Sequence, residues 1–230
     1  DKFDKNQDSF QGSSGVAWIH LGLIGSQWRQ PSEERKERFL YFIAHEGFHQ
    51  FQGPSDPNFM DVAWLIEGSA DFFADWAMKD LGWISVERLR DKIAESANRC
   101  VRLMKVHPTA LTPLDPKANF GLTYACGRLV HQVADAQLKN VGGFAELWKR
   151  ILAALNSGNS QSRKFVDAEV YFSALKQAGV PESAVQELKK FVFVVQSDPV
   201  KSISLLFQLA GLKFRLEPDP KDKQRQIFVL

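Results

Sequence analysis

The sequence predicts a mainly α fold (α+β class), with a small β element near the N-terminus and a β-hairpin at the C-terminus. Apolar residues recur every three or four positions through most of the chain after residue 32, which is the period of an amphipathic helix. The segment 15–22 is instead short, β-branched and aromatic, and glycines bound it, so a strand is expected there. Near the end, 211–216 and 224–230 flank a polar turn that contains two prolines, as in a hairpin.

The helices follow one another without an internal repeat. Residues 1–14 are polar and rich in glycine and serine, so a loop is expected before the strand. Ser32 is the expected N-cap of the first helix, because Glu33 and Glu34 follow it where the helix dipole favours negative charge, and Gly53-Pro54 is expected to end that helix. Further helices are predicted at 61–82, 86–106, 120–139, 143–155, 165–178, 182–196 and 200–209.

The composition is that of a globular protein with a sizeable core. Of the 230 residues, 44% are hydrophobic and 24% are charged, and the formal net charge is +2 with both signs interspersed. A nucleic-acid-binding surface is therefore not expected. No apolar run approaches the length of about 18 residues that a membrane-spanning helix needs, so no transmembrane segment is expected. Cys100 and Cys126 can form one disulfide or remain two buried thiols; the sequence leaves both open, as it does the oligomeric state.

The stretch 42–50 contains a complete H-E-x-x-H motif at His45, Glu46 and His49. On a helix, residues four apart lie on the same face with Cβ atoms about 5–6 Å apart, so two imidazoles at this spacing can bind one zinc ion. Glu46 follows one step round the helix, where its carboxylate can reach a water on the metal. The motif therefore predicts two ligands and a general base within five residues.

A catalytic zinc usually takes three protein ligands, and Glu67 is the most suggestive third one. It lies 18 positions after His49, beyond a turn-rich loop that can bring a second helix against the first. Its neighbours are apolar, and an unpaired carboxylate would be costly there, whereas a metal removes that cost. Asp71 lies one helical turn further on and can accept the free N–H of a ligating histidine. Gly47 and the small residues 68–70 are expected to let these two helices approach closely.

Together, H-E-x-x-H and the segment Trp64-Leu-Ile-Glu-Gly-Ser-Ala-Asp71 resemble the gluzincin metallopeptidases, the group that holds thermolysin and the aminopeptidase N relatives. This version looks most like the compact peptidase-MA-like domains of bacteria. No G-x-M-E-N segment is present, which argues against a true aminopeptidase. The resemblance implies a single zincin-like catalytic domain over 1–230, made of the strand and the two metal-site helices at 15–81, a helical part at 86–210 and the hairpin at 211–230.

The resemblance also implies the composition of the site. It implies one zinc ion per chain, with His45, His49 and Glu67 as ligands, Glu46 as the base and Asp71 as the partner of a ligating histidine. The expected reaction is the hydrolysis of peptide bonds by a zinc-activated water, on a peptide or protein substrate.

A group that stabilises the oxyanion is still needed, and the resemblance points to a Tyr or His on a later helix. Tyr124 is the first choice, and Arg128 and His131 share its helical face as candidate substrate or transition-state contacts. Ala17 and Trp18 belong to the predicted strand, which the resemblance implies is an edge strand that pairs with an extended peptide above the cleft.

Two alternatives to a zinc metallopeptidase stay open at this point. One is a catalytically retired domain that serves as a binding or regulatory module, although retention of Glu46 argues against it. The other is a zinc hydrolase that acts on a non-peptide substrate. An extracytoplasmic location is expected, because such peptidases are often exported and the chain does not begin with Met.

Overall fold

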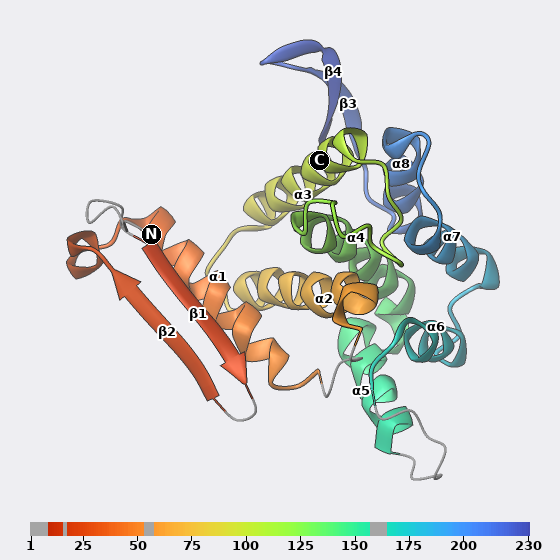
Figure 1. Ribbon diagram of the computed structural model, residues 1–230, viewed down its shortest axis with the longest axis horizontal. Coiled ribbons are helices and arrows are strands. Elements are labelled where there is room, and N and C mark those ends of the chain that lie inside the picture. Colours follow the sequence, from red (N-terminus) through yellow and green to blue (C-terminus); the bar gives the residue numbers. More distant parts are fainter. Residues whose placement is uncertain (1–8, 16–17, 53–57, 157–164) are drawn as a thin grey trace.

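The computed structural model describes residues 9–15, 18–52, 58–156 and 165–230. Within these ranges the chain is mainly helical with a small β-hairpin towards each end, which confirms the predicted fold class (Figure 1). The helices are α1 (Glu33–His49), α2 (Phe59–Asp80), α3 (Val86–Val106), α4 (Gly121–Leu138), α5 (Gly143–Asn156), α6 (Ala168–Gln177), α7 (Glu182–Phe193) and α8 (Pro199–Leu209). The strands are β1 (Ser9–Gly15), β2 (Trp18–Ile24), β3 (Arg215–Asp219) and β4 (Asp222–Val229).

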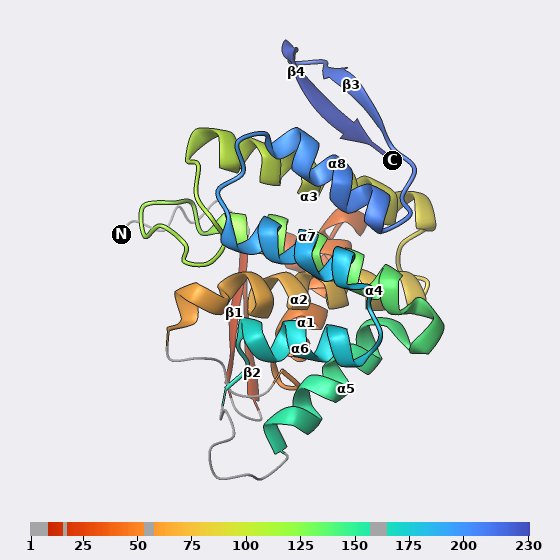
Figure 2. The same cartoon turned by 90° about the vertical axis from the view of Figure 1, so that its right-hand side faces the viewer.

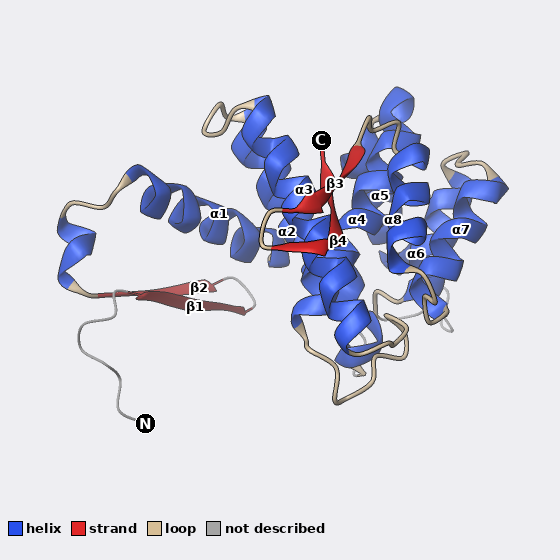
Figure 3. Ribbon diagram, turned by 90° about the horizontal axis from the view of Figure 1, so that it is seen from above, coloured by secondary structure: helices blue, strands red, loops and turns tan. Residues whose placement is uncertain are grey.

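The N-terminal β element is a two-stranded antiparallel hairpin, so the expected loop over 1–14 is wrong for residues 9–14, whereas residues 1–8 lie outside the described ones. The pairing runs from Ser9 opposite Ile24 to Gly15 opposite Trp18. The serines and glycines of β1 have low strand propensity, which is why the sequence predicted a loop. Pairing with the β-branched and aromatic β2 decides its conformation. The hairpin lies beside α1, away from the other helices (Figure 3).

The helical body is built around α2 and α4, which pack against each other more extensively than any other pair of described helices. Trp64 and Leu65 of α2 and Leu129 and Val130 of α4 are almost fully buried between them and their neighbours. α1 packs on α2, whereas α3, α5 and α8 pack on α4. α6 and α7 join α5 to α8 and close the far side of the body (Figure 2).

The backbones of α2 and α4 approach each other closely at Gly68 of α2 and Gly127 of α4. A Cβ atom on Gly68 would lie 2.5 Å from the carbonyl carbon of Gly127, and one on Gly127 would lie 2.1 Å from the carbonyl oxygen of Trp64. The expected close approach of α1 and α2 through Gly47 is wrong, because a Cβ there would meet no heavy atom within 4 Å. Gly68 serves the contact of α2 with α4 instead, whereas Ser69 Oγ accepts a hydrogen bond from Gln52 (2.7 Å), which follows α1.

A disulfide bond joins Cys100 of α3 to Cys126 of α4, which resolves the alternative that the sequence left open. Both cysteines are fully buried in the core. The bond therefore fixes α3 against α4.

The C-terminal hairpin forms as predicted, with Arg215 opposite Val229 and Asp219 opposite Asp222. Phe228 is its buried anchor, because Asn98 of α3 accepts a hydrogen bond from the Phe228 amide (2.7 Å) and donates one to its carbonyl (3.1 Å). The turn end of the hairpin projects away from the helices (Figure 2). Among the described helices, none is both long enough and apolar enough to cross a membrane.

Candidate metal centre

α1 presents His45 and His49 on one face, as the i, i+4 spacing predicts. Ser32 caps the helix, since its hydroxyl accepts a hydrogen bond from the Arg35 amide (3.3 Å), and Glu33 and Glu34 lie in the first turn. The two Nε2 atoms lie 3.1 Å apart. The last turn of α1 therefore brings both imidazoles to one point.

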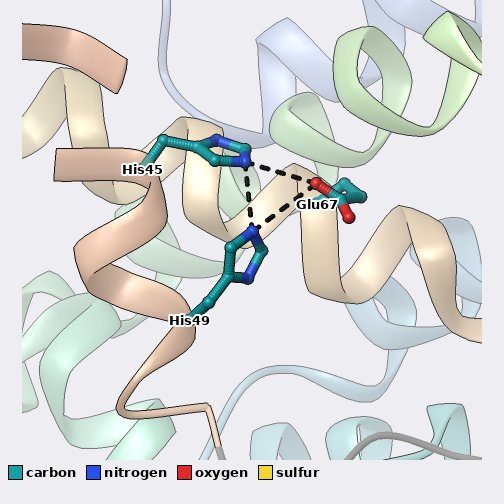
Figure 4. Close-up of side chains that lie close together, drawn as sticks. All are labelled: His45, His49 and Glu67. Atoms are coloured by element: carbon teal, nitrogen blue, oxygen red, sulfur yellow. Dashed lines mark hydrogen bonds and ion pairs between the residues drawn. The ribbon is translucent and has the colours of Figure 1, made fainter. Parts of the chain in front are cut away.

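α2 supplies the third group. Glu67 Oε2 lies 3.3 Å from His45 Nε2 and 3.7 Å from His49 Nε2 (Figure 4). The three ligand atoms all lie within 4.8 Å of one another, and the side chains that carry them are largely buried. The structure thus brings together all three residues that the sequence nominated as ligands.

The Nδ1 atom of each imidazole, which points away from the cluster, already forms a hydrogen bond with another side chain. Asp71 Oδ1 lies 2.9 Å from His45 Nδ1, and a carboxylate can only accept, so His45 Nδ1 donates. Gln52 Oε1 lies 2.6 Å from His49 Nδ1. The Gln52 amide nitrogen donates to Ile66 O (2.6 Å) and Ser69 Oγ (2.7 Å), so Oε1 is the acceptor and His49 Nδ1 also donates.

This assignment leaves an electron-rich cluster at the centre. Neutral imidazoles that donate from Nδ1 carry a lone pair on Nε2. Two such lone pairs and one carboxylate oxygen of Glu67 therefore face one another without a hydrogen between them. The cluster needs a cation, either a proton or a metal ion, and two imidazoles with one carboxylate are a donor set that could hold a metal ion such as zinc.

The raised pKa of His45 shows that a positive charge is favoured in this cluster. Burial alone lowers the pKa of the His45 imidazole, but the hydrogen bonds that it donates to the carboxylates of Asp71 and Glu67, together with their negative charges, outweigh burial and raise the pKa to about 9. In the metal-free protein, His45 therefore holds a proton at neutral pH. A metal ion that binds here has to displace it.

Glu46 and Tyr124 flank the cluster. Glu46 lies beside His45 on α1 and is partly exposed, so its carboxylate has access to solvent. The ring of Tyr124, from α4, stacks on the His45 ring with centroids 5.9 Å apart. Burial and the negative charge of Glu67 raise the pKa of the Tyr124 hydroxyl far above its ordinary range, so the hydroxyl keeps its proton.

The other two candidates on α4 do not join the cluster. Arg128 is buried, forms an ion pair with Asp75 and donates to Ser96 Oγ (2.8 Å). His131 is fully buried in the core, with Nε2 3.2 Å from Leu65 O and Nδ1 3.1 Å from the Tyr171 hydroxyl. Burial lowers the pKa of His131 to about 3, so it is a neutral core residue.

The predicted strand contacts lie partly outside the described residues. Ala17 is not among them. Trp18 is the first residue of β2, and its partner across the hairpin is Gly15. The role of both in binding an extended peptide stays a prediction.

Two residues of the site were missed by sequence reasoning. Gln52 is buried and accepts a hydrogen bond from His49 Nδ1. It was overlooked because a polar residue just after the end of a helix is usually exposed to solvent. Its position three residues after a ligand was the available signal. Tyr41 lies one turn before His45, and its hydroxyl donates to the Asp71 carbonyl (3.4 Å). It therefore supports the helix that carries the partner of His45.

Comparison with known proteins adds no family assignment: no protein-family model and no curated protein matches this chain. The site has to be interpreted from its own geometry.

Proposed function

We propose that this chain is a zinc-dependent metallopeptidase that hydrolyses peptide bonds with a water molecule activated at His45, His49 and Glu67. The observation that carries the proposal is the convergence of two imidazole lone pairs and a carboxylate oxygen, with the other nitrogen of each imidazole held by Asp71 or Gln52. Partners of this kind orient metal ligands and raise their basicity.

The chain's own residues can supply the remaining chemistry. Bound zinc would lower the pKa of a water and polarise the scissile carbonyl. Glu46, next to the ligand His45, would accept the proton of that water and deliver it to the leaving amine. Tyr124 keeps its hydroxyl proton and faces the site, so it can donate a hydrogen bond to the oxyanion.

The test combines metal analysis with one substitution. Purified protein should bind about one zinc per chain. Glu46→Gln should keep the zinc and lose hydrolysis of an unbiased peptide library by a factor of at least about 100, as expected for removal of a general base. Glu34→Gln is the matched control, because Glu34 is an exposed glutamate in the first turn of the same helix.

Three outcomes separate the alternatives. Protein that stays metal-free after zinc addition would refute the proposal. Zinc binding without cleavage of any peptide would indicate a binding module or a hydrolase for another substrate. Undiminished cleavage by Glu46→Gln would remove Glu46 as the base.

A further inference from the structure

A cavity of about 450 Å³ adjoins the metal centre on the side of Asp71 and Tyr124. Both residues also contact His45, the first through a hydrogen bond of 2.9 Å and the second through its stacked ring. α3 forms the opposite wall through Lys92, Ser96 and their neighbours. The volume falls in the range of about 300–1,000 Å³ that is usual for sites that bind small ligands.

Most charges in the wall of this cavity are already neutralised. Arg128 is paired with the buried Asp75. Lys92 Nζ lies 3.6 Å from Glu37 Oε1 and 3.7 Å from Asp75 Oδ1. Neither cation is therefore free to bind a substrate.

The two acidic residues of the wall, Asp71 and Glu95, also interact with neighbouring side chains. Asp71 accepts the His45 N–H, and Glu95 Oε1 lies 3.0 Å from Arg88 Nη1. Arg99 is the exception: it lines the cavity, it is exposed, and it has no ion-pair partner among the residues that the structure describes. Arg99 is therefore the one cation in the described wall of the cavity without an ion-pair partner.

Gly121 of α4 leaves space for the Arg99 side chain. A Cβ on Gly121, the first residue of α4, would lie only 2.4 Å from Arg99 Nη2, so the guanidinium lies directly against this glycine. Gly121 is three residues before Tyr124 on the same helix. The guanidinium thus lies near the end of α4 that also carries the hydroxyl next to the metal site.

We propose that Arg99 binds a substrate carboxylate in this cavity, so that the site prefers peptides with an acidic side chain or a free C-terminus close to the cleaved bond. The inference rests on the proposed peptidase function. A guanidinium pairs with a carboxylate through two parallel hydrogen bonds, which gives both affinity and orientation. The other cations of the cavity wall, Lys92 and Arg128, are paired with Glu37 and Asp75 and do not compete for that carboxylate.

The first test is cleavage by zinc-loaded protein of three peptide sets. One set carries an acidic residue and an amidated C-terminus, one is neutral with a free C-terminus, and one is neutral and amidated. We expect one carboxylate set to be cleaved about tenfold faster or more than the neutral amidated set, in line with a charge-assisted pair. Which set is preferred identifies the source of the carboxylate.

Arg99→Gln should abolish that preference while the zinc content stays at one per chain. Arg102→Gln is the matched control, because Arg102 is an exposed arginine one turn further along α3 and does not line the cavity. Equal cleavage of the three sets by the unaltered protein, or a preference that survives Arg99→Gln, would overturn the inference.

The second test does not depend on cleavage. Zinc-loaded Glu46→Gln protein is titrated by calorimetry with short peptides from the same three sets. The carboxylate peptide should bind about tenfold more tightly than its amide, and Arg99→Gln should remove the difference. A carboxylate that binds the metal directly would be unaffected by Arg99→Gln, and this result would overturn the inference.

The two tests fail in different ways. Arg99-dependent binding without cleavage of any peptide would leave the carboxylate site standing and refute the peptidase function. Zinc-dependent cleavage that does not depend on Arg99 would support the peptidase function and refute the carboxylate site.

Discussion

His45 and His49 occupy the same helix face, but different partners hold them. A carboxylate supports His45, whereas the amide of Gln52 supports His49. The hydrogen bonds and negative charges of Asp71 and Glu67 raise the pKa of His45.

Zinc affinity should depend on pH through His45. Its pKa of about 9 in the folded, metal-free protein lies above the ordinary 6.5. Protonated His45 thus stabilises the metal-free fold fully below pH 6.5, and this contribution is lost as pH rises through 9. Since zinc displaces that proton, its apparent affinity should rise about tenfold per pH unit up to pH 9.

Competition with a chromophoric chelator at several pH values would measure this dependence. Asp71→Asn removes the charge that raises the pKa, so the rise in affinity should level off at a lower pH. A zinc affinity that is constant between pH 6.5 and 9 would contradict the assignment of His45.

Gln52→Ala should weaken zinc binding by about 10- to 100-fold, because it removes the acceptor that orients His49. Ser69→Ala is the comparison, since it removes one hydrogen bond of Gln52 but leaves its contact with His49. Its effect should be smaller. Chelator competition gives the affinities and circular dichroism confirms that both variants are folded. Equal zinc affinity of Gln52→Ala and the unaltered protein would show that His49 needs no such partner.

At the scale of elements, the Gly68–Gly127 contact determines how α4 lies on α2. Glu67 immediately precedes Gly68, and Tyr124 lies one helical turn before Gly127. The close crossing therefore sets the separation between the third ligand and the hydroxyl that faces it. A side chain at either glycine would force the two backbones apart.

Gly127→Ala should lower the free energy of unfolding by about 1–3 kcal/mol, the usual cost of overpacking. Gly47→Ala is the matched control on α1, where the added Cβ meets no atom within 4 Å. There the substitution should be stabilising by up to about 1 kcal/mol, because alanine has the higher helix propensity. Chemical denaturation of both variants measures the difference. Equal stability of the two would contradict the close crossing.

At the scale of the molecule, α4 connects α2, which carries Glu67, to the helices that follow it in the chain. It contacts α2 on one face and α3, α5 and α8 on the others. The disulfide between Cys100 and Cys126 adds a covalent link between α3 and α4, two residues after Tyr124. The site is therefore supported by contacts that come from far along the chain.

Reduction of the disulfide should lower the free energy of unfolding by about 3.5 kcal/mol, the value that loop-closure entropy gives for a loop of this length. The sequence separation of the two cysteines is 26 residues. Chemical denaturation of the oxidised protein, and of protein unfolded and refolded in reductant, gives the difference. Identical midpoints and slopes would show that the link contributes nothing.

Much of the helical pattern could be predicted because local rules determine it. Ser32 caps α1 as expected, and apolar residues recur with the helical period. β1 could not be predicted, since its strand conformation depends on pairing with β2 rather than on its own residues. Gln52 was missed for the same reason: its role depends on the carbonyl and hydroxyl of α2 that it meets.

The sequence by itself determined the two histidines, the base beside them and the acid 18 positions further on, because helix geometry fixes residues four apart on one face. Only the tertiary structure decided that Glu67 meets them, that Tyr124 stacks on His45, and that His131 belongs to the core. Those relations depend on how α1, α2 and α4 pack. Packing is set by contacts between residues distant in the chain, such as Gly68 and Gly127, which no local pattern encodes.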